Sequence, residues 1–467
     1  MEKFEAFIEG NAALGRFKRF FEGRLYPALT VLCVLIGSTT GSEFILNIFN
    51  ILAMSAALLL VDSVLALLVP FTTIIYQVSL KNSPGHPTFS DYYFSGWRLP
   101  VLIFLIIIFA LSIGFFLFRM QIWRRLSFKK TPLLLPLIIL SLAFLLNGVF
   151  SEGVGVDNLL FALSQAFAFL GIFAVFAAGL SEKDDAKRIG EYFSYASLLI
   201  TLLLFSELLV RYITAWDAIF AGGSIVKDEV LLGWGIWNPI GVSIAVLIPM
   251  NFYGALKSRH HLLYFGGAIL ATLGAFMSMS RNAMIFSSLA FLSCILICCF
   301  VGEQKRFFRI TSAVGAAMLA VLAIALREKL FAIISSALSL GDNGRFDIWG
   351  EAIREFLKNP LFGTGFWSVP SDAFYVTSFL PPFAHQTFVE LLSACGIVGL
   401  LAYLFYRAKS AVPFLRRPTL LKTMLGISIL VLLGESLLDN FVFYIYTMVY
   451  YNAALASAFH LDAISEG

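Results

Sequence analysis

Residues 98–119 read RLPVLIFLIIIFALSIGFFLFR, an apolar run with one arginine at each end. A helix needs about 20 such residues to cross a hydrocarbon core of about 30 Å, where the backbone polar groups must be satisfied within the protein. The 467-residue chain is 59% hydrophobic and 13% charged, against roughly 25% charged residues in an ordinary soluble domain. We therefore expect an all-α polytopic membrane protein.

Comparable apolar runs recur along the chain and predict about 12–14 transmembrane helices. The predicted spans cover residues 25–41, 44–60, 62–79, 98–119, 132–150, 157–180, 191–213, 237–256, 263–279, 283–301, 308–326, 384–407, 420–438 and 440–460. The run 44–79 is the hardest to divide, because it fits one long helix, two helices or a re-entrant pair. Its division decides the orientation of everything that follows it.

The basic connectors orient the chain. With the amino terminus inside the cell, the positive-inside rule is met at each of them: 124–130, 183–188, 257–261, 305–309 and 407–422. Reading 44–79 as one span places these connectors outside, so the rule favours two spans. We expect both termini to be cytoplasmic and the polar stretches 79–97, 215–236 and 327–383 to face outward.

The amino-terminal segment 1–24 has apolar residues at helical spacing among basic ones. This pattern predicts an amphipathic helix on the inner membrane surface rather than a cleavable signal. Formal net charge is +4, and the five cysteines (Cys33, Cys294, Cys298, Cys299 and Cys395) all lie in apolar segments. They are expected to act as small hydrophobes, without disulfides or metal.

The polar stretch 327–383 marks the region where chemistry is expected, because the rest of the chain is mostly apolar. Arg345 opens a short amphipathic helix within it, just after Asn343, and free N–H groups at a helix start favour an anion. Gly363 and Gly365 either form a tight turn or allow a ligand to approach the backbone. Arg281, next to Ser280 between two adjoining spans, either reaches lipid headgroups or holds a phosphate.

His385 follows this stretch and begins the next apolar run. A histidine at a membrane entrance is suited to act as a general base, while the alternative is a capping or hydrogen-bonded histidine at the start of a helix. Glu390 lies five residues later, about 140° around an ideal helix. It is therefore not expected to form a dyad with His385 and instead could pair with an arginine elsewhere. The outer loops contain no close D-x-D pair of the kind that holds a divalent cation on a diphosphate, so we expect no metal ion or other cofactor.

These motifs, in this order, resemble the O-antigen ligase and O-antigen polymerase superfamily across residues 230–407. The resemblance rests on Ser280-Arg281, on Arg345 with Ile348-Trp349, on the run 359–365 (NPLFGTG), and on 385–388 (HQTF) with 396–399 (GIVG). It implies a membrane glycosyltransferase of the C-type fold class at the outer face of the bacterial cytoplasmic membrane. Such enzymes act on undecaprenyl-diphosphate-linked glycans without a metal and invert the transferred sugar.

The resemblance also implies roles and partners. Arg281 and Arg345 would hold the donor diphosphate and His385 would assist the acceptor hydroxyl, supported by Ser280, Asn343, Gly363, Gly365, Gln386 and Glu390. The partners would be the lipid-linked oligosaccharide donor, a lipid-borne glycan acceptor, membrane lipids and a chain-length regulator, with no nucleic acid. The implied organisation is N-terminal spans 25–230, a catalytic region 231–407 and C-terminal spans 408–467. Gln386 departs from the asparagine that often follows the histidine.

Several alternatives stay open. A lipid-linked oligosaccharide flippase or another transporter would also be a helical bundle, but it would carry charges deep in several spans. Here Glu207 and Arg211 share one helix at a spacing that allows them to pair, and Glu435 and Asp439 lie near another span. A peptidoglycan polymerase is disfavoured because no outer-loop aspartate stands out. Between polymerase and ligase, fourteen spans rather than the usual twelve of ligases slightly favour a polymerase.

Overall fold

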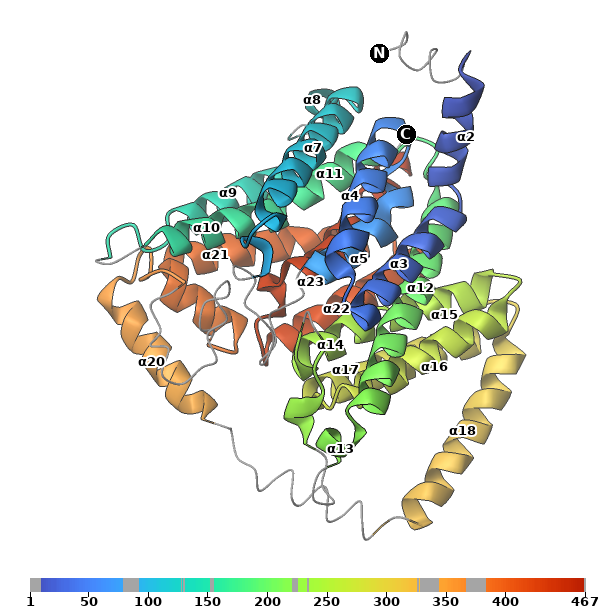
Figure 1. The fold of residues 1–467 in the computed structure, drawn as a ribbon. Helices are drawn as coiled ribbons and strands as arrows, with labels where there is room; N and C mark the ends of the chain where they lie inside the picture. Colours follow the sequence, from blue (N-terminus) through green and yellow to red (C-terminus); the bar gives the residue numbers. More distant parts are fainter. Residues whose placement is uncertain are drawn as a thin grey trace.

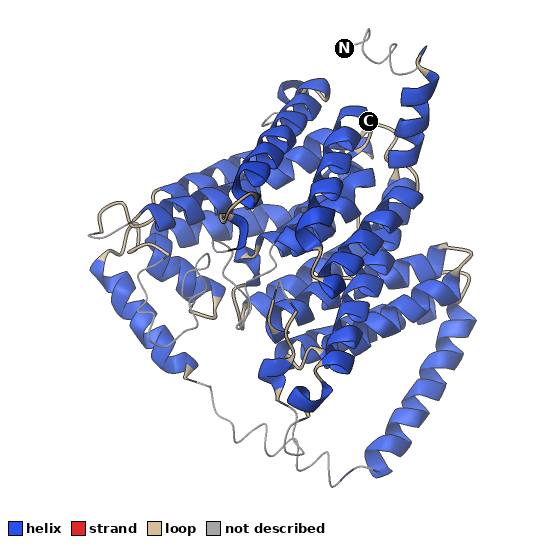
Figure 2. Ribbon diagram, viewed as in Figure 1, coloured by secondary structure: helices blue, strands red, loops and turns tan. Residues whose placement is uncertain are grey.

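The computed structural model describes residues 10–78, 92–126, 128, 131–151, 155–220, 226–232, 235–325, 327, 344–366 and 384–465. These residues form helices and one isolated β-bridge between Leu232 and Gly235 (Figure 2). The predicted all-α membrane fold is confirmed. Asn343 and most of the polar stretch 327–383 lie outside the described residues.

Figure 1 shows the helices as one bundle. The first half of the chain forms α2 (Ala12–Phe21), α3 (Leu25–Thr40), α4 (Glu43–Leu60), η1 (Val64–Leu67), α5 (Leu68–Val78), α7 (Arg98–Arg119), α8 (Ile122–Arg125), α9 (Leu134–Leu145), α10 (Val156–Ala166), the π-helical turn η2 (Phe167–Gly171), α11 (Ile172–Gly179), α12 (Ala186–Thr214) and α13 (Trp216–Ile219). The second half forms η4 (Lys227–Glu229), α14 (Trp237–Ala245), α15 (Ile248–Lys257), α16 (His261–Met277), α17 (Arg281–Phe300), α18 (Lys305–Ala325), α20 (Arg345–Lys358), α21 (Thr387–Leu415), α22 (Leu420–Ser436), η6 (Phe441–Phe443) and α23 (Ile445–Ile464).

Every predicted span coincides with one helix or with two or three consecutive helical segments. Among the described residues, seven helices are long and apolar enough to cross a membrane, and the bent pair α2–α3 makes an eighth if it is one span. The other predicted spans coincide with helices that are shorter or less apolar, such as α9 with 12 residues and α16 with 17. The count of full-length spans is therefore smaller than the 12–14 expected.

The ambiguous run 44–79 forms two helices, as the basic connectors indicated. Helix α4 ends at Leu60 because Val61 turns to an extended conformation. Ser63 then caps the next helical segment by accepting a hydrogen bond from the backbone N–H of Leu65. The two helices contact each other.

The centre of the bundle is the span built from α14 and α15. Its apolar window is entirely buried, whereas only 22% of the α7 window is buried. Helices α12, α16, α17 and α22 pack around α15. Because α7 turns Phe104, Ile106 and Leu111 outward, it belongs to the lipid-facing rim of a membrane bundle.

Several polar contacts lie near the two chain termini, at the top of Figure 1. Side chains of α2, α12, α22 and α23 take part, together with the segment before η1. The pairs are Lys18 with Asp62, Ser63 with Asp184, Arg188 with Asp184, and Lys422 with Asp462. The basic connectors 183–188 and 407–422, both predicted to be cytoplasmic, therefore lie near the chain ends.

Arg211 of α12, which was expected to pair with Glu207 in the same helix, has an ion-pair partner outside this helix. Arg211 instead binds Glu229, beyond the end of the helix, at 3.2 Å. Glu207 is buried inside the bundle, whereas the Arg211 side chain is 30% exposed. The guanidinium thus pairs at the bundle surface, where less desolvation is required.

Candidate functional site

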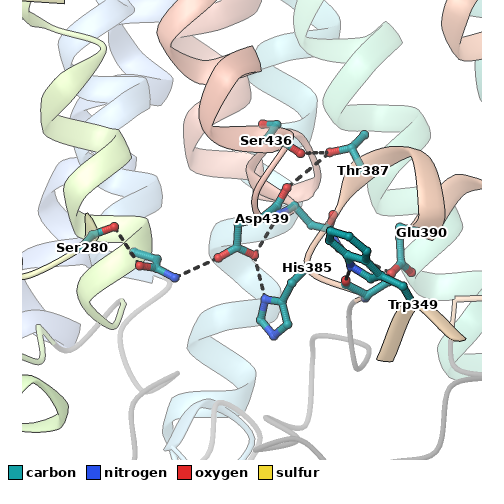
Figure 3. A network of polar contacts seen from close by, with 10 residues as sticks. Ser280, Trp349, His385, Thr387, Glu390, Ser436 and Asp439 are labelled. Carbon is teal, nitrogen blue, oxygen red and sulfur yellow. Dashed lines mark hydrogen bonds and ion pairs between the residues drawn. The ribbon is translucent and has the colours of Figure 1, made fainter. Parts of the chain in front are cut away.

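Four helix ends meet at a chain of hydrogen bonds (Figure 3). His385 precedes α21 and its Nδ1 lies 3.0 Å from Oδ1 of Asp439, in the connector after α22. Oδ2 of Asp439 accepts a hydrogen bond from Nδ2 of Asn238, in the first turn of α14, at 3.0 Å. The Ser280 hydroxyl, which caps α17, donates to Oδ1 of Asn238 at 2.8 Å. The histidine singled out from the sequence is thus joined to the Ser280-Arg281 junction.

His385 has an uncommon backbone conformation. Its φ is +51°, in the left-handed region that non-glycine residues seldom adopt. Gln386 then returns to an extended conformation, and its side chain caps α21 by accepting a hydrogen bond from the Val389 N–H at 2.6 Å. The capping role considered for His385 therefore belongs to its neighbour Gln386. Strained backbone of this kind persists only where its surroundings hold it in place.

Ala384, the residue before His385, forms hydrogen bonds through both its backbone carbonyl and its backbone N–H. Trp349 of α20 donates its indole N–H to the Ala384 carbonyl at 2.9 Å, and the Ala384 N–H donates to Glu390 at 2.7 Å. Glu390 is buried and also accepts from Asn440 at 3.4 Å. The arginine partner suggested for Glu390 is not found among the described residues. Glu390 instead fixes the turn that carries His385.

His385 and Asp439 form an ion pair when the histidine is protonated. The His385 side chain is 35% exposed and that of Asp439 is 5% exposed. Burial opposes the charged imidazole, but the Asp439 carboxylate outweighs it and raises the pKa of His385. Burial likewise opposes the charged carboxylate, but His385 and the Asn440 N–H lower the pKa of Asp439. In the neutral histidine, a proton on Nδ1 facing Asp439 leaves the basic lone pair on Nε2.

Arg345 acts electrostatically on this pair. It is the first residue of α20 and follows Gly344, whose φ of +74° begins the helix. Its positive charge lowers the pKa of both His385 and Asp439. The structure therefore places Arg345 within electrostatic range of His385.

Arg281 reaches the site indirectly. It is the first residue of α17 and is exposed, and its guanidinium has no ion-pair partner among the residues described. Its neighbour Ser280 connects to His385 through Asn238 and Asp439. An exposed arginine at a helix start suits either an anionic ligand or lipid headgroups.

Gly363 and Gly365 pack against protein backbone. Helix α21 is broken at Gly396, where φ is +65°. The turn after α20 fills this break: the Thr364 N–H donates to the Ser393 carbonyl at 2.8 Å, and the Gly365 N–H donates to the Ala394 carbonyl at 3.0 Å. Of the two roles considered for these glycines, the tight turn is the one observed, and it fixes α20 relative to α21.

Replacing Gly363 with alanine is expected to destabilise this junction. The residue has a φ of +69°, and a Cβ there would overlap the backbone of Ala394. We expect the free energy of unfolding to fall by at least about 2 kcal/mol, measured by thermal unfolding in detergent. The control is Gly350→Ala, in α20, where an added Cβ meets no atom within 4 Å. Equal stability of the two variants would contradict the assignment.

Asp439 and Asn238 are the site residues that sequence reasoning missed. From the sequence, Asp439 counted only as a deep charge of the transporter alternative. A usable signal was nevertheless present, because Asp439 stands in the short connector between predicted spans 420–438 and 440–460. The predicted topology puts that connector on the same side of the membrane as His385. Asn238 carried no comparable signal.

The fold and the site define a polytopic membrane protein with a charged polar site where four helix ends meet. Residues 266–404 match the family model described as O-antigen ligase. No curated protein matches the chain. The match confirms the superfamily resemblance over this region and supports a glycosyltransferase-type membrane enzyme. It includes Ser280, Arg281, Arg345 and His385, whereas Asn238 and Asp439 lie outside the matched residues.

Proposed function

We propose that this protein transfers glycan from an undecaprenyl-diphosphate-linked donor to an acceptor hydroxyl at the outer face of the bacterial cytoplasmic membrane. The observation that carries the proposal is the His385–Asp439 pair, 3.0 Å apart, beside the positive charge of Arg345. This combination supports His385 as the proton acceptor and Arg345 as the anion-stabilising group of the proposed reaction. Both are needed when a sugar leaves a diphosphate.

The proposed reaction is a direct displacement at the anomeric carbon. The acceptor oxygen forms the new glycosidic bond as the bond to the diphosphate oxygen breaks, and Nε2 of His385 takes the hydroxyl proton. Arg345 and Arg281 stabilise the negative charge on the leaving lipid diphosphate without a metal ion, because fixed cations need no reorganisation. A single displacement inverts the configuration of the sugar.

The distribution of charge along the bundle supports the proposed orientation. The basic connectors 183–188 and 407–422 lie near the two chain ends, and positive connectors are characteristic of the cytoplasmic side. Helices α13 and α20 lie toward the opposite end in Figure 1. Trp349 of α20 contacts Ala384, beside His385, which supports an outward-facing site.

Reconstitution into vesicles distinguishes this proposal from a flippase. Purified protein is supplied with undecaprenyl-diphosphate-linked glycan extracted from its host and with the host's lipid-borne acceptor. A new glycosidic bond, detected by mass spectrometry, is the expected result. Donor that crosses the bilayer with no new bond, under the same conditions, would overturn the enzyme proposal.

The acceptor decides between a polymerase and a ligase. We favour a polymerase that extends repeat units still attached to their lipid, assisted by a chain-length regulator, on the predicted number of spans. Deletion of the gene is then expected to leave single repeats unextended at the cell surface. Long chains that accumulate without attachment to a lipid-anchored core would instead identify a ligase.

The transfer rate is expected to fall as the pH drops through the pKa of His385, because a base must be neutral to accept a proton. Burial lowers this pKa, but Asp439 raises it by a larger amount. The inflection should therefore lie above the usual histidine value of about 6.5. Asp439→Asn removes the raising charge and should move the inflection to lower pH, measured as rate against pH. The control is Asp217→Asn, an exposed acid in α13. An unchanged inflection in Asp439→Asn would contradict the pairing.

A further inference from the structure

Asn238 uses both ends of its side-chain amide to join two parts of the site. Its Oδ1 accepts from the Ser280 hydroxyl at 2.8 Å, and its Nδ2 donates to Oδ2 of Asp439 at 3.0 Å. The partners are 42 and 201 residues away in the sequence. The amide therefore bridges the junction that carries Arg281 and the carboxylate that holds His385.

The orientation of this amide follows from its partners. The Ser280 hydroxyl accepts a hydrogen bond from the Ala283 N–H at 3.4 Å as the cap of α17, so its own proton points toward Asn238. This arrangement turns the amide carbonyl to Ser280 and the NH2 group to Asp439. A donor facing a carboxylate stabilises its negative charge.

The backbone brings α14 close enough for this bridge. Gly241 follows Asn238 by three residues and lies on the same face of the helix. A Cβ on Gly241 would lie 2.7 Å from the Ser278 hydroxyl and would overlap the Ala283 side chain. Helix α14 is therefore in close contact with the α16–α17 junction, independently of the hydrogen bonds of Asn238.

We propose that Asn238 is a positioning residue that couples the anion site at Arg281 to the base at His385. This inference rests on the proposed glycan transfer. Asn238 holds the α17 start against Asp439, and its NH2 group shares the charge of the carboxylate that His385 also contacts. Without this donor, the Asp439 carboxylate interacts more strongly with His385, and the pKa of His385 rises.

The sharpest variant is Asn238→Leu, which keeps the approximate size and shape of the side chain and removes the NH2 donor. Loss of the hydrogen bond to Asp439 should raise the pKa of His385 by roughly half a unit in Asn238→Leu and in Asn238→Ala, since hydrogen bonds to charged groups contribute on that scale. We also expect the transfer rate at neutral pH to fall about 10-fold in each. Ser280→Ala, which leaves the amide without its orienting partner, should shift the pKa in the same direction by less.

The pKa of His385 can be measured without any substrate. Diethyl pyrocarbonate modifies the neutral imidazole, and mass spectrometry of the His385 peptide reports its modification as a function of pH in the full-length protein. The matched control is Asn251→Ala in α15, a buried asparagine that donates to Thr201 and to the Leu247 carbonyl, away from the site. Thermal unfolding of each variant shows that it is folded.

The outcomes separate this inference from the proposed function. An upward shift of the His385 pKa in Asn238→Leu and Ser280→Ala, absent in Asn251→Ala, supports the coupling. An unshifted pKa in Asn238→Leu overturns it even if His385 proves essential for transfer, and the pKa in Ser280→Ala decides the question in the same way if Asn238→Leu does not fold. If the pKa shifts but no variant and no wild-type protein transfers glycan in the vesicle assay, the proposed function fails and the hydrogen-bond coupling stands.

Discussion

His385→Ala is expected to lower the rate of glycan transfer by about 100- to 10,000-fold, the usual contribution of a general base. The physical reason is that the acceptor hydroxyl then has to lose its proton to water while it attacks. Donor binding should change little, because the arginines remain. The measurement is the initial rate of glycosidic bond formation in vesicles, at saturating donor and at several pH values.

The control for this experiment is His260→Ala. His260 lies at the α15–α16 turn, is exposed, and accepts a hydrogen bond from its neighbour Arg259 at 3.0 Å. The His260→Ala variant should transfer glycan at the wild-type rate. The His385 variant should also lose the inflection that the wild type has above the usual histidine pKa, since the titrating group is gone. Transfer at the wild-type rate by His385→Ala would rule out the proposed base.

The positions of the helices could be read from the sequence because they depend on local composition. A run such as 98–119 contains enough apolar residues to form a span by itself, and α7 has those limits. The breaks were harder to predict. The break of α21 at Gly396 depends on a turn that packs into it from 361–365, and no pattern within the run itself reveals this distant partner.

The site was predictable where charge stands out in apolar sequence, as at Arg345 and His385. Its hydrogen bonds were not, because they join residues far apart: 54 positions separate His385 from Asp439, and 201 separate Asn238 from Asp439. Helical periodicity suggests neighbours within a helix, such as Glu207 and Arg211, but the contact made by Arg211 crosses to another segment. The partners of a polar residue in a bundle depend on which helix ends meet.

Arg345→Ala is expected to have the second large effect, a loss of about 100- to 1,000-fold in the rate of transfer, on the scale of removing one fixed group that stabilises transition-state charge. Arg345→Lys should recover only part of the rate, because an ammonium keeps the charge but not the two parallel donors that match phosphate oxygens. The control is Arg354→Ala on the same helix. Arg354 is 65% exposed and pairs with Glu351 rather than with the site.

Arg345→Ala also tests whether Arg345 lies beside the base. A role in donor binding alone predicts no change in the pH dependence of the rate, whereas a position beside His385 does. Arg345 lowers the pKa of His385, so its removal should move the inflection of the rate profile to higher pH. Asp439→Asn should move it to lower pH, and Arg345→Lys should leave it near the wild-type position. A slower Arg345→Ala enzyme with an unshifted inflection would mean that Arg345 acts on the donor from a distance, and that His385 does not share its site.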